Sequence, residues 1–192
     1  MKTSALLLAG ALGAIAGCGN HSGTGREPDE YTGCGSDENW RAFSDQEPTA
    51  TVADATAPLM TAPAAGAMLP SATKPKLSWQ QDATDIGMPD GDVVHSGPSC
   101  TDCCPQYNTG ALQTLHLPPI SGNAYDLQFS VDGKDAWRVI TTLQEWGPTD
   151  ALWATWKGKT VSLKIYRMEL LRNDVKQGPY VATAAFTFSV GN

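Results

Sequence analysis

The sequence lacks a cluster of basic residues, and it lacks any apolar run long enough to cross a membrane. Its 192 residues include 13 Lys and Arg against 20 Asp and Glu, which gives a formal net charge of -7. Binding to a nucleic-acid backbone depends on grouped Lys and Arg, so we expect no nucleic-acid partner. The longest apolar stretch, residues 5–16, is shorter than the roughly 20 residues that a spanning helix needs. We therefore do not expect an integral membrane protein.

Sequence motifs of catalysis are missing as well. The chain has no Gly-x-Ser-x-Gly nucleophile turn, no His-Glu-x-x-His zinc motif, no phosphate-binding glycine loop and no dinucleotide fingerprint. It has only three histidines, and His21 lies close to the N-terminus. We therefore expect a protein that is not an enzyme and that carries no cofactor.

The N-terminus is the most informative segment of the chain. Lys2 precedes the apolar residues 5–16, and small side chains then lead to Ile15-Ala16-Gly17-Cys18. A positive start, a short apolar region and small residues at the end are typical of an export signal. The last four residues resemble the lipobox of bacterial lipoproteins. That resemblance implies a signal peptide over residues 1–17 and a lipid, of the diacylglycerol and palmitate type, on Cys18. An ordinary secretory signal with an incidental cysteine is the alternative.

The residues after Cys18 predict where in the cell the protein is located and that a spacer separates the lipid from the folded domain. Gly19 follows Cys18, and in bacterial lipoproteins the absence of Asp at this place permits passage to the outer membrane. We therefore expect a lipid-anchored protein of the cell envelope, at the outer membrane. Residues 18–57 are rich in Gly, Asp, Glu, Ser and Thr, which predicts an acidic tether. Cys34 and Trp40 are unusual in a tether, so we expect part of it to contact the folded domain.

From residue 58 onward the pattern predicts a mostly β domain. Short segments alternate apolar and polar residues, as antiparallel strands with one solvent-exposed face do. One short helix is expected over about 149–157, because Thr149 can cap its start and Gly158 can end it. The expected strands cover residues 125–131, 137–143, 161–168 and 180–190.

Part of this domain resembles a known family of modules. The residues Pro58-Leu-Met-Thr-Ala-Pro63 are followed by Pro75-Lys-Leu77-Ser-Trp79. This order is similar to the opening of fibronectin type III and immunoglobulin-like modules, and it implies an antiparallel β-sandwich over residues 58–192 with Trp79 between the sheets. The stretch at about 80–110 is longer than a usual strand connection, and we interpret it as a Cys-containing loop insertion.

The cysteines predict disulfides. If Cys18 carries a lipid, four of the five cysteines remain: Cys34, Cys100, Cys103 and Cys104. In an exported protein an even number of thiols favours two disulfides. A bond between the neighbours Cys103 and Cys104 would be strained. The two other pairings both join Cys34 to Cys103 or Cys104, and both stay open.

A metal site is the alternative for the same loop. Cys100, Cys103 and Cys104 supply thiolates, and His95 and His116 supply imidazoles, a donor set that suits Cu or Zn. Their spacing is not that of a zinc knuckle, so disulfides are the favoured interpretation.

Together these features predict a lipid-anchored envelope protein with a non-catalytic binding or structural module. The expected partners are the membrane, through the lipid, and a protein or glycan ligand. A metal-binding envelope lipoprotein that uses the His95 and Cys100 loop is the second hypothesis.

Overall fold

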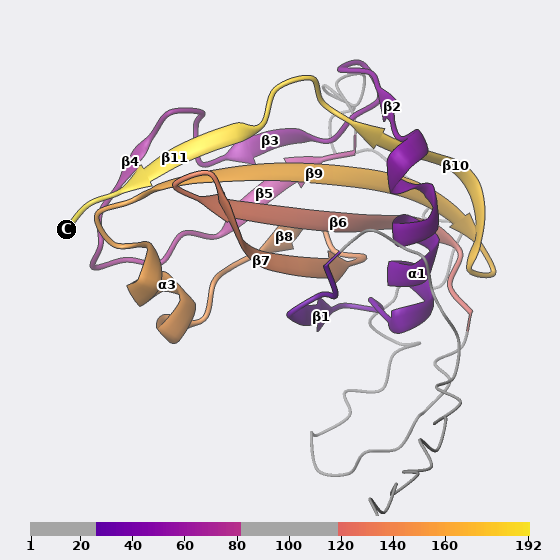
Figure 1. Cartoon of the computed structure of the whole chain (residues 1–192), viewed down its shortest axis with the longest axis horizontal. Helices are drawn as coiled ribbons and strands as arrows, with labels where there is room; N and C mark the ends of the chain where they lie inside the picture. Colours follow the sequence, from indigo (N-terminus) through magenta and orange to yellow (C-terminus); the bar gives the residue numbers. More distant parts are fainter. Residues whose placement is uncertain (1–25, 82–118) are drawn as a thin grey trace, which may run out of the picture.

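The computed structural model describes residues 26–81 and 119–192, and these residues form a mostly β protein with two α-helices (Figure 1). The helices are α1 (Asp37–Gln46) and α3 (Asp150–Trp156), and a short 3-10 turn, η1 (Glu47–Thr49), follows α1. The strands are β1 (Glu30–Thr32), β2 (Thr51–Val52), β3 (Leu59–Ala62), β4 (Met68–Leu69), β5 (Leu77–Gln80), β6 (Gly122–Val131), β7 (Lys134–Thr141), β8 (Glu145–Trp146), β9 (Thr160–Leu171), β10 (Asp174–Val181) and β11 (Phe186–Val190).

The strands form two sheets. The larger one is mixed and has eight strands, with β6, β7 and β9 at its centre, and the smaller one is antiparallel in the order β3-β5-β8. β6 and β7 form a hairpin because Asp132 and Gly133 both adopt positive φ angles at its turn. The short strands β1, β2 and β4 join the large sheet in parallel pairs at its margins.

The main hydrophobic core lies between the two sheets. Leu77 and Trp79 of the small sheet belong to the same buried cluster as Leu127 and Phe129 of the large sheet. Trp79 is only 3% exposed and meets Tyr125 edge-on, which confirms that it lies between sheets. Helix α3 closes one end of this core with its buried residues Leu152, Trp153 and Trp156.

A second core lies on the opposite face of the large sheet, under α1. Phe43 of α1 is buried there with Ile140, Met168 and Leu170, and Figure 1 shows α1 lying across one end of the large sheet. Gly35 precedes the helix and approaches β7 so closely that a Cβ atom there would lie 2.3 Å from the Ile140 carbonyl oxygen. The start of α1 is therefore held directly against β7.

The predicted strands are present, with two differences from the sequence analysis. The expected strand 180–190 is divided, because β10 pairs with the second half of β9 and β11 with its first half. The segment expected to be a tether, residues 18–57, is folded over most of its described part, where β1, α1, η1 and β2 pack on the large sheet. The reason is the apolar side of α1, which carries Phe43 and Trp40.

The helix predicted at about 149–157 is confirmed as α3, and the Thr149 hydroxyl caps it by accepting a hydrogen bond from the Leu152 amide. Nearly all of the expected loop insertion, together with its cysteines, lies outside the described residues. Over residues 26–81 and 119–192, neither helix has the length and apolar character that crossing a bilayer demands.

Candidate functional site

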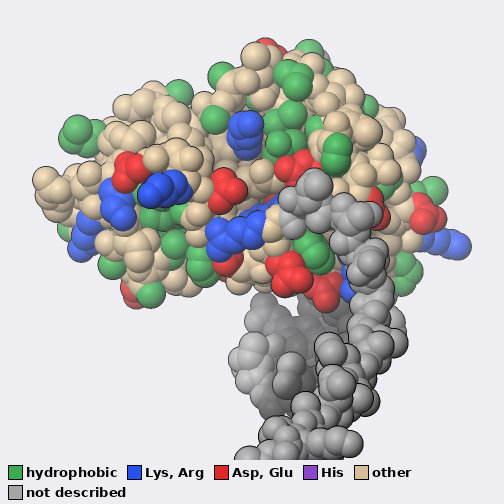
Figure 2. Space-filling model, in the orientation of Figure 1, with side chains coloured by type: hydrophobic (Ala, Val, Ile, Leu, Met, Phe, Trp, Pro, Cys, Tyr) green, Lys and Arg blue, Asp and Glu red, His purple; other side chains and the backbone are tan. Residues whose placement is uncertain are grey.

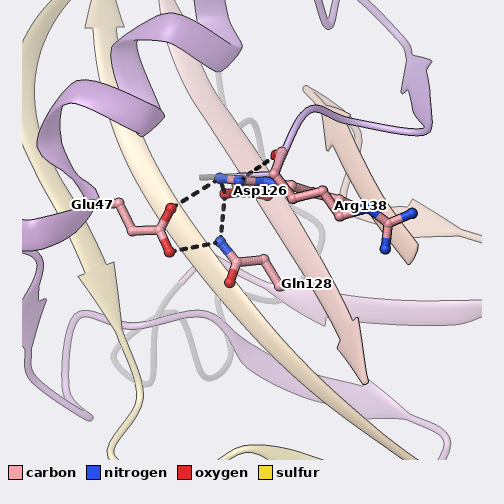
Figure 3. Close-up of polar contacts among 5 residues, drawn as sticks. Glu47, Asp126, Gln128 and Arg138 are labelled. Atoms are coloured by element: carbon pink, nitrogen blue, oxygen red, sulfur yellow. Dashed lines mark hydrogen bonds and ion pairs between the residues drawn. The ribbon is translucent and has the colours of Figure 1, made fainter. Parts of the chain in front are cut away.

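A buried cluster of charged side chains lies on the α1 side of the large sheet. Asp126 and Gln128 project from β6 and Arg138 from β7, and strand register places Gln128 directly beside Arg138. Glu47, the first residue after α1, completes the cluster from above the sheet (Figure 3). The alternation of the strands turns Asp126, Gln128 and Arg138 to the face opposite Leu127 and Phe129.

The Arg138 guanidinium is the centre of this cluster. Its Nε donates to Asp126 Oδ1 at 2.9 Å and its Nη2 to Asp126 Oδ2 at 2.5 Å, a two-pronged contact with the carboxylate. Nη2 also contacts Glu47 Oε2 at 3.1 Å, and Nη1 donates to the carbonyl oxygen of Arg26 at 2.7 Å. Gln128 links the two acids by donating to Asp126 at 3.0 Å and to Glu47 at 3.2 Å.

The electrostatics of the cluster follow from its burial. Arg138 is 3% exposed and Asp126 1% exposed, so neither charge is well solvated. Burial raises the pKa of the Asp126 carboxyl, and the hydrogen bonds from Arg138 and Gln128 only partly oppose this effect. Burial alone would lower the pKa of Arg138, but its contacts with Asp126 and Glu47 raise it. The guanidinium therefore stays charged between two carboxyl groups.

The cluster also ties down the segment that leads to the N-terminus. The Asp29 carboxylate accepts a hydrogen bond from the Arg138 amide at 2.9 Å, and the Asp29 amide donates to the Arg138 carbonyl at 2.9 Å. β1 follows at once and pairs in parallel with β7. A hollow of about 110 Å³ adjoins this contact and is lined partly by Arg26, Glu47 and Asp135.

The contacts of this buried charged cluster are typical of a group of residues that stabilises the fold rather than of a reactive centre. Both carboxylates and all three guanidinium nitrogens of Arg138 are occupied by one another or by the backbone. The described residues contain no group of three or more His, Cys, Asp or Glu side chains that could hold a metal ion. The cluster holds the N-terminal segment, α1 and the large sheet together.

Of the site residues predicted from the sequence, the structure describes only Cys34. Its side chain is 1% exposed, and its amide donates to the Thr142 hydroxyl at 2.9 Å, which places it beside the end of β7. The lipidation residue Cys18 lies outside the described residues. So do His95, Cys100, Cys103, Cys104 and His116.

The sequence analysis did not single out Arg138, Asp126, Gln128 or Glu47. The strand pattern placed the first three on a polar face, and a polar face usually contacts solvent. One signal for this site is present in the sequence, namely the three-residue spacing of the apolar residues Trp40 and Phe43. A helix with apolar residues along one side packs that side against another part of the protein.

Comparison of the chain with protein-family models, with curated proteins and with solved structures finds no match.

Proposed function

We propose that this chain is a lipid-anchored protein of the bacterial cell envelope, at the outer membrane, whose β domain is a non-catalytic binding or structural module. The pattern Ile15-Ala16-Gly17-Cys18 supports the anchor. This pattern, which follows Lys2 and the apolar residues 5–16, is the observation that carries the proposal. Arg26, only eight residues beyond Cys18, already accepts a hydrogen bond from Arg138. At about 3.3–3.6 Å per residue, such a spacer reaches at most about 29 Å.

The consequence is a domain held close to the bilayer. The lipid would be linked through a short connection to β1, which is itself fixed to β7 by pairing and by the buried Arg138 contact.

The finer description of the fold belongs to the same proposal. Two sheets that enclose Trp79 support a relation to immunoglobulin-like or fibronectin type III modules. The parallel pairs at the margins of the large sheet are an addition that the resemblance did not imply.

The partner is proposed to be a protein or glycan of the envelope rather than nucleic acid. The net charge of -7 disfavours a phosphate backbone. Acidic and basic side chains are interspersed over the face shown in Figure 2, so that face is not uniformly basic.

The anchor is tested by replacing the lipidated residue. In Cys18→Ser the protein should lose metabolic labelling with a fatty acid, and it should leave the membrane fraction or accumulate as the uncleaved precursor. Cys34→Ser is the control for the loss of a cysteine elsewhere in the chain and should keep the label, because Cys18 is the cysteine of the lipobox-like pattern. Membrane association of the Cys18→Ser protein at high salt would contradict the proposal.

The cysteine bridges are proposed as part of this exported module. Burial of Cys34 against the end of β7 supports a role in stabilising the N-terminal segment. A bond from Cys34 to Cys103 or Cys104 would close a loop of about 70 residues, for which the chain-entropy model gives about 4 kcal/mol of stabilisation.

Mass spectrometry of the non-reduced, proteolysed protein checks this bridge. A peptide that contains Cys34 should be linked to one that contains Cys103 or Cys104, and reduction should lower the melting temperature. Four alkylatable thiols together with about one equivalent of bound Cu or Zn would instead support the metal-binding alternative at His95 and the neighbouring cysteines.

A further inference from the structure

The hollow beside the buried charged cluster lies at an edge of the large sheet. β1 pairs with β7 only from Val139 to Thr141, so within the described residues no strand continues the sheet beside the first part of β7. The pairing of β6 and β7 shifts by one residue between Trp137 and Asp135, which marks a β-bulge. Bulges at sheet edges redirect the side chains of the strand that carries them. Here Trp137 and Asp135 both line the hollow, whose volume is about 110 Å³.

The hollow is open to solvent. Arg26 and Asp135, which line it, are exposed, and the side chain of Glu47 is 28% exposed. Trp137 is only partly buried, whereas the four tryptophans of the main core are 1–5% exposed. An aromatic side chain and several polar groups therefore meet solvent in the same depression, which is the usual composition of a ligand site.

Three side chains of the lining have hydrogen-bond acceptors that the protein does not fully use. Gln128 donates through its Nε2 to both Asp126 and Glu47, so its amide group is fixed in orientation, and its Oε1 points away from both acids (Figure 3). No hydrogen bond within the described residues uses this oxygen. Each oxygen of Glu47 accepts one hydrogen bond, and a carboxylate oxygen has room for two. The Asp135 carboxylate takes part in no hydrogen bond or ion pair with any described residue.

Arg26 supplies hydrogen-bond donors to the same hollow. Its Nη2 donates to Asp29 at 2.6 Å, while its Nε and Nη1 make no hydrogen bond within the described part of the chain. The backbone of Arg26 is held by Arg138, whose Nη1 donates to the Arg26 carbonyl oxygen at 2.7 Å. The side chain therefore starts from a fixed point of the lining and keeps N–H groups available for a ligand.

This mixture of groups selects a ligand that carries hydroxyls. A carboxylate ligand only accepts hydrogen bonds and an ammonium group only donates them, so neither matches the whole lining. A hydroxyl group both donates and accepts, which suits the acceptors on Gln128, Glu47 and Asp135 beside the donors of Arg26. The exposed part of Trp137 adds an apolar surface, against which the C–H groups of a sugar ring pack.

The size of the hollow limits how much of a ligand enters it. A bound water needs about 10–15 Å³, and drug-sized ligands occupy pockets of about 300–1,000 Å³. At about 110 Å³, the hollow takes several water-sized groups, which corresponds to a single sugar residue at the end of a chain.

We propose that the hollow at the edge of β7 binds the terminal residue of a neutral glycan. Gln128, Glu47 and Asp135 accept hydrogen bonds from its hydroxyls. Arg26 donates to a hydroxyl oxygen, and Trp137 packs against the sugar ring. The site rests on the binding role proposed above, and it commits that role to a glycan rather than a protein ligand.

Titration of the full mature protein, in a detergent without a sugar headgroup, tests the site. The probes are the methyl glycosides of glucose, galactose, mannose and N-acetylglucosamine, with n-butylammonium and acetate as charged controls. At least one glycoside should shift the Trp137 indole N–H signal in nuclear magnetic resonance spectra, with a dissociation constant of about 1–10 mM. No saturable shift with any of the four glycosides at tens of millimolar, or saturation by a charged control alone, would overturn the proposal.

Variants separate binding at this site from the stability of the fold. Asp135→Ala should weaken binding of that glycoside about 10- to 100-fold, the factor that a hydrogen bond to a charged group contributes. Its melting temperature should stay that of wild type, because Asp135 is exposed. Asp174→Ala is the matched control, since it removes an exposed carboxylate of β10 that does not line the hollow, and it should keep the wild-type affinity.

If Asp135→Ala binds the glycoside as tightly as wild type does, the site is wrong. The Cys18→Ser experiment is independent of this result, so failure here leaves the anchor standing.

Discussion

Replacing Arg138 by Met should lower the free energy of unfolding by about 3–5 kcal/mol at neutral pH, because it leaves a buried carboxylate without its partner. Asp126 is 1% exposed and receives two hydrogen bonds from Arg138. The same change also removes the contact with the Arg26 carbonyl. Urea unfolding followed by tryptophan fluorescence measures the effect.

A double variant provides the control. In Arg138→Met combined with Asp126→Leu both charges are absent, and most of the lost stability should return, since a buried ion pair can often be replaced by apolar groups of similar size. A double variant that is less stable than the single one would contradict the view that the loss comes from an unpaired charge.

The loss in Arg138→Met should also depend on pH. Burial already raises the pKa of Asp126 in the folded protein, and removal of Arg138 should raise it further. As the pH falls, Asp126 in the folded protein therefore takes up a proton at a higher pH than it does in the unfolded chain, where the pKa of an Asp is about 3.9. Stability should therefore increase as the pH falls from the folded-state pKa toward about 4. A penalty that stays constant over this range would contradict the assignment to Asp126.

Replacing Trp156 by Ala should destabilise the protein by a similar amount, about 3–5 kcal/mol, because it opens a cavity in the main core. Trp156 is 1% exposed, and its ring meets those of Phe129, Trp153 and Phe188 at centroid distances of 5.2–6.2 Å. It joins α3 to the large sheet. Thermal unfolding followed by circular dichroism measures the loss.

Trp40→Ala is the matched control for this core variant. Trp40 is only partly buried and packs at the edge of the second core, so its loss should be clearly smaller. Equal losses for the two variants would show that the core between the sheets does not dominate the stability.

The sequence predicted the strands of the large sheet well because their pattern is local. Leu127 and Phe129 alternate with polar residues, and the structure turns both into the core. The helix α3 was also predictable, since Thr149 provides its cap and buried residues occupy one side of it. These features depend on neighbours in the chain, so the amino-acid order alone is enough to indicate them.

The parts that the sequence did not predict depend on contacts between distant segments. The strand pattern indicates that Asp126 and Arg138 lie on a solvent-exposed face of the sheet. In the structure they are covered by α1 and Glu47, which are about 80–90 residues away in the chain. The low hydrophobicity of residues 37–46 is typical of a tether, although Phe43 is buried in the second core and Trp40 packs against that core. Arg167 likewise lies in a strand that was predicted correctly, but the contact of its guanidinium carbon with the Tyr180 ring, at 5.2 Å from the ring centre, is visible only in three dimensions.

The most direct test of the central claim is the mass of the N-terminal peptide of the protein extracted from membranes. The lipoprotein assignment predicts a mature chain that starts at Cys18 and carries a diacylglyceryl group on its sulfur and an acyl chain on its amino group. A chain that starts at any other residue, or an unmodified Cys18, would contradict the claim that a lipid on Cys18 holds this domain at the membrane.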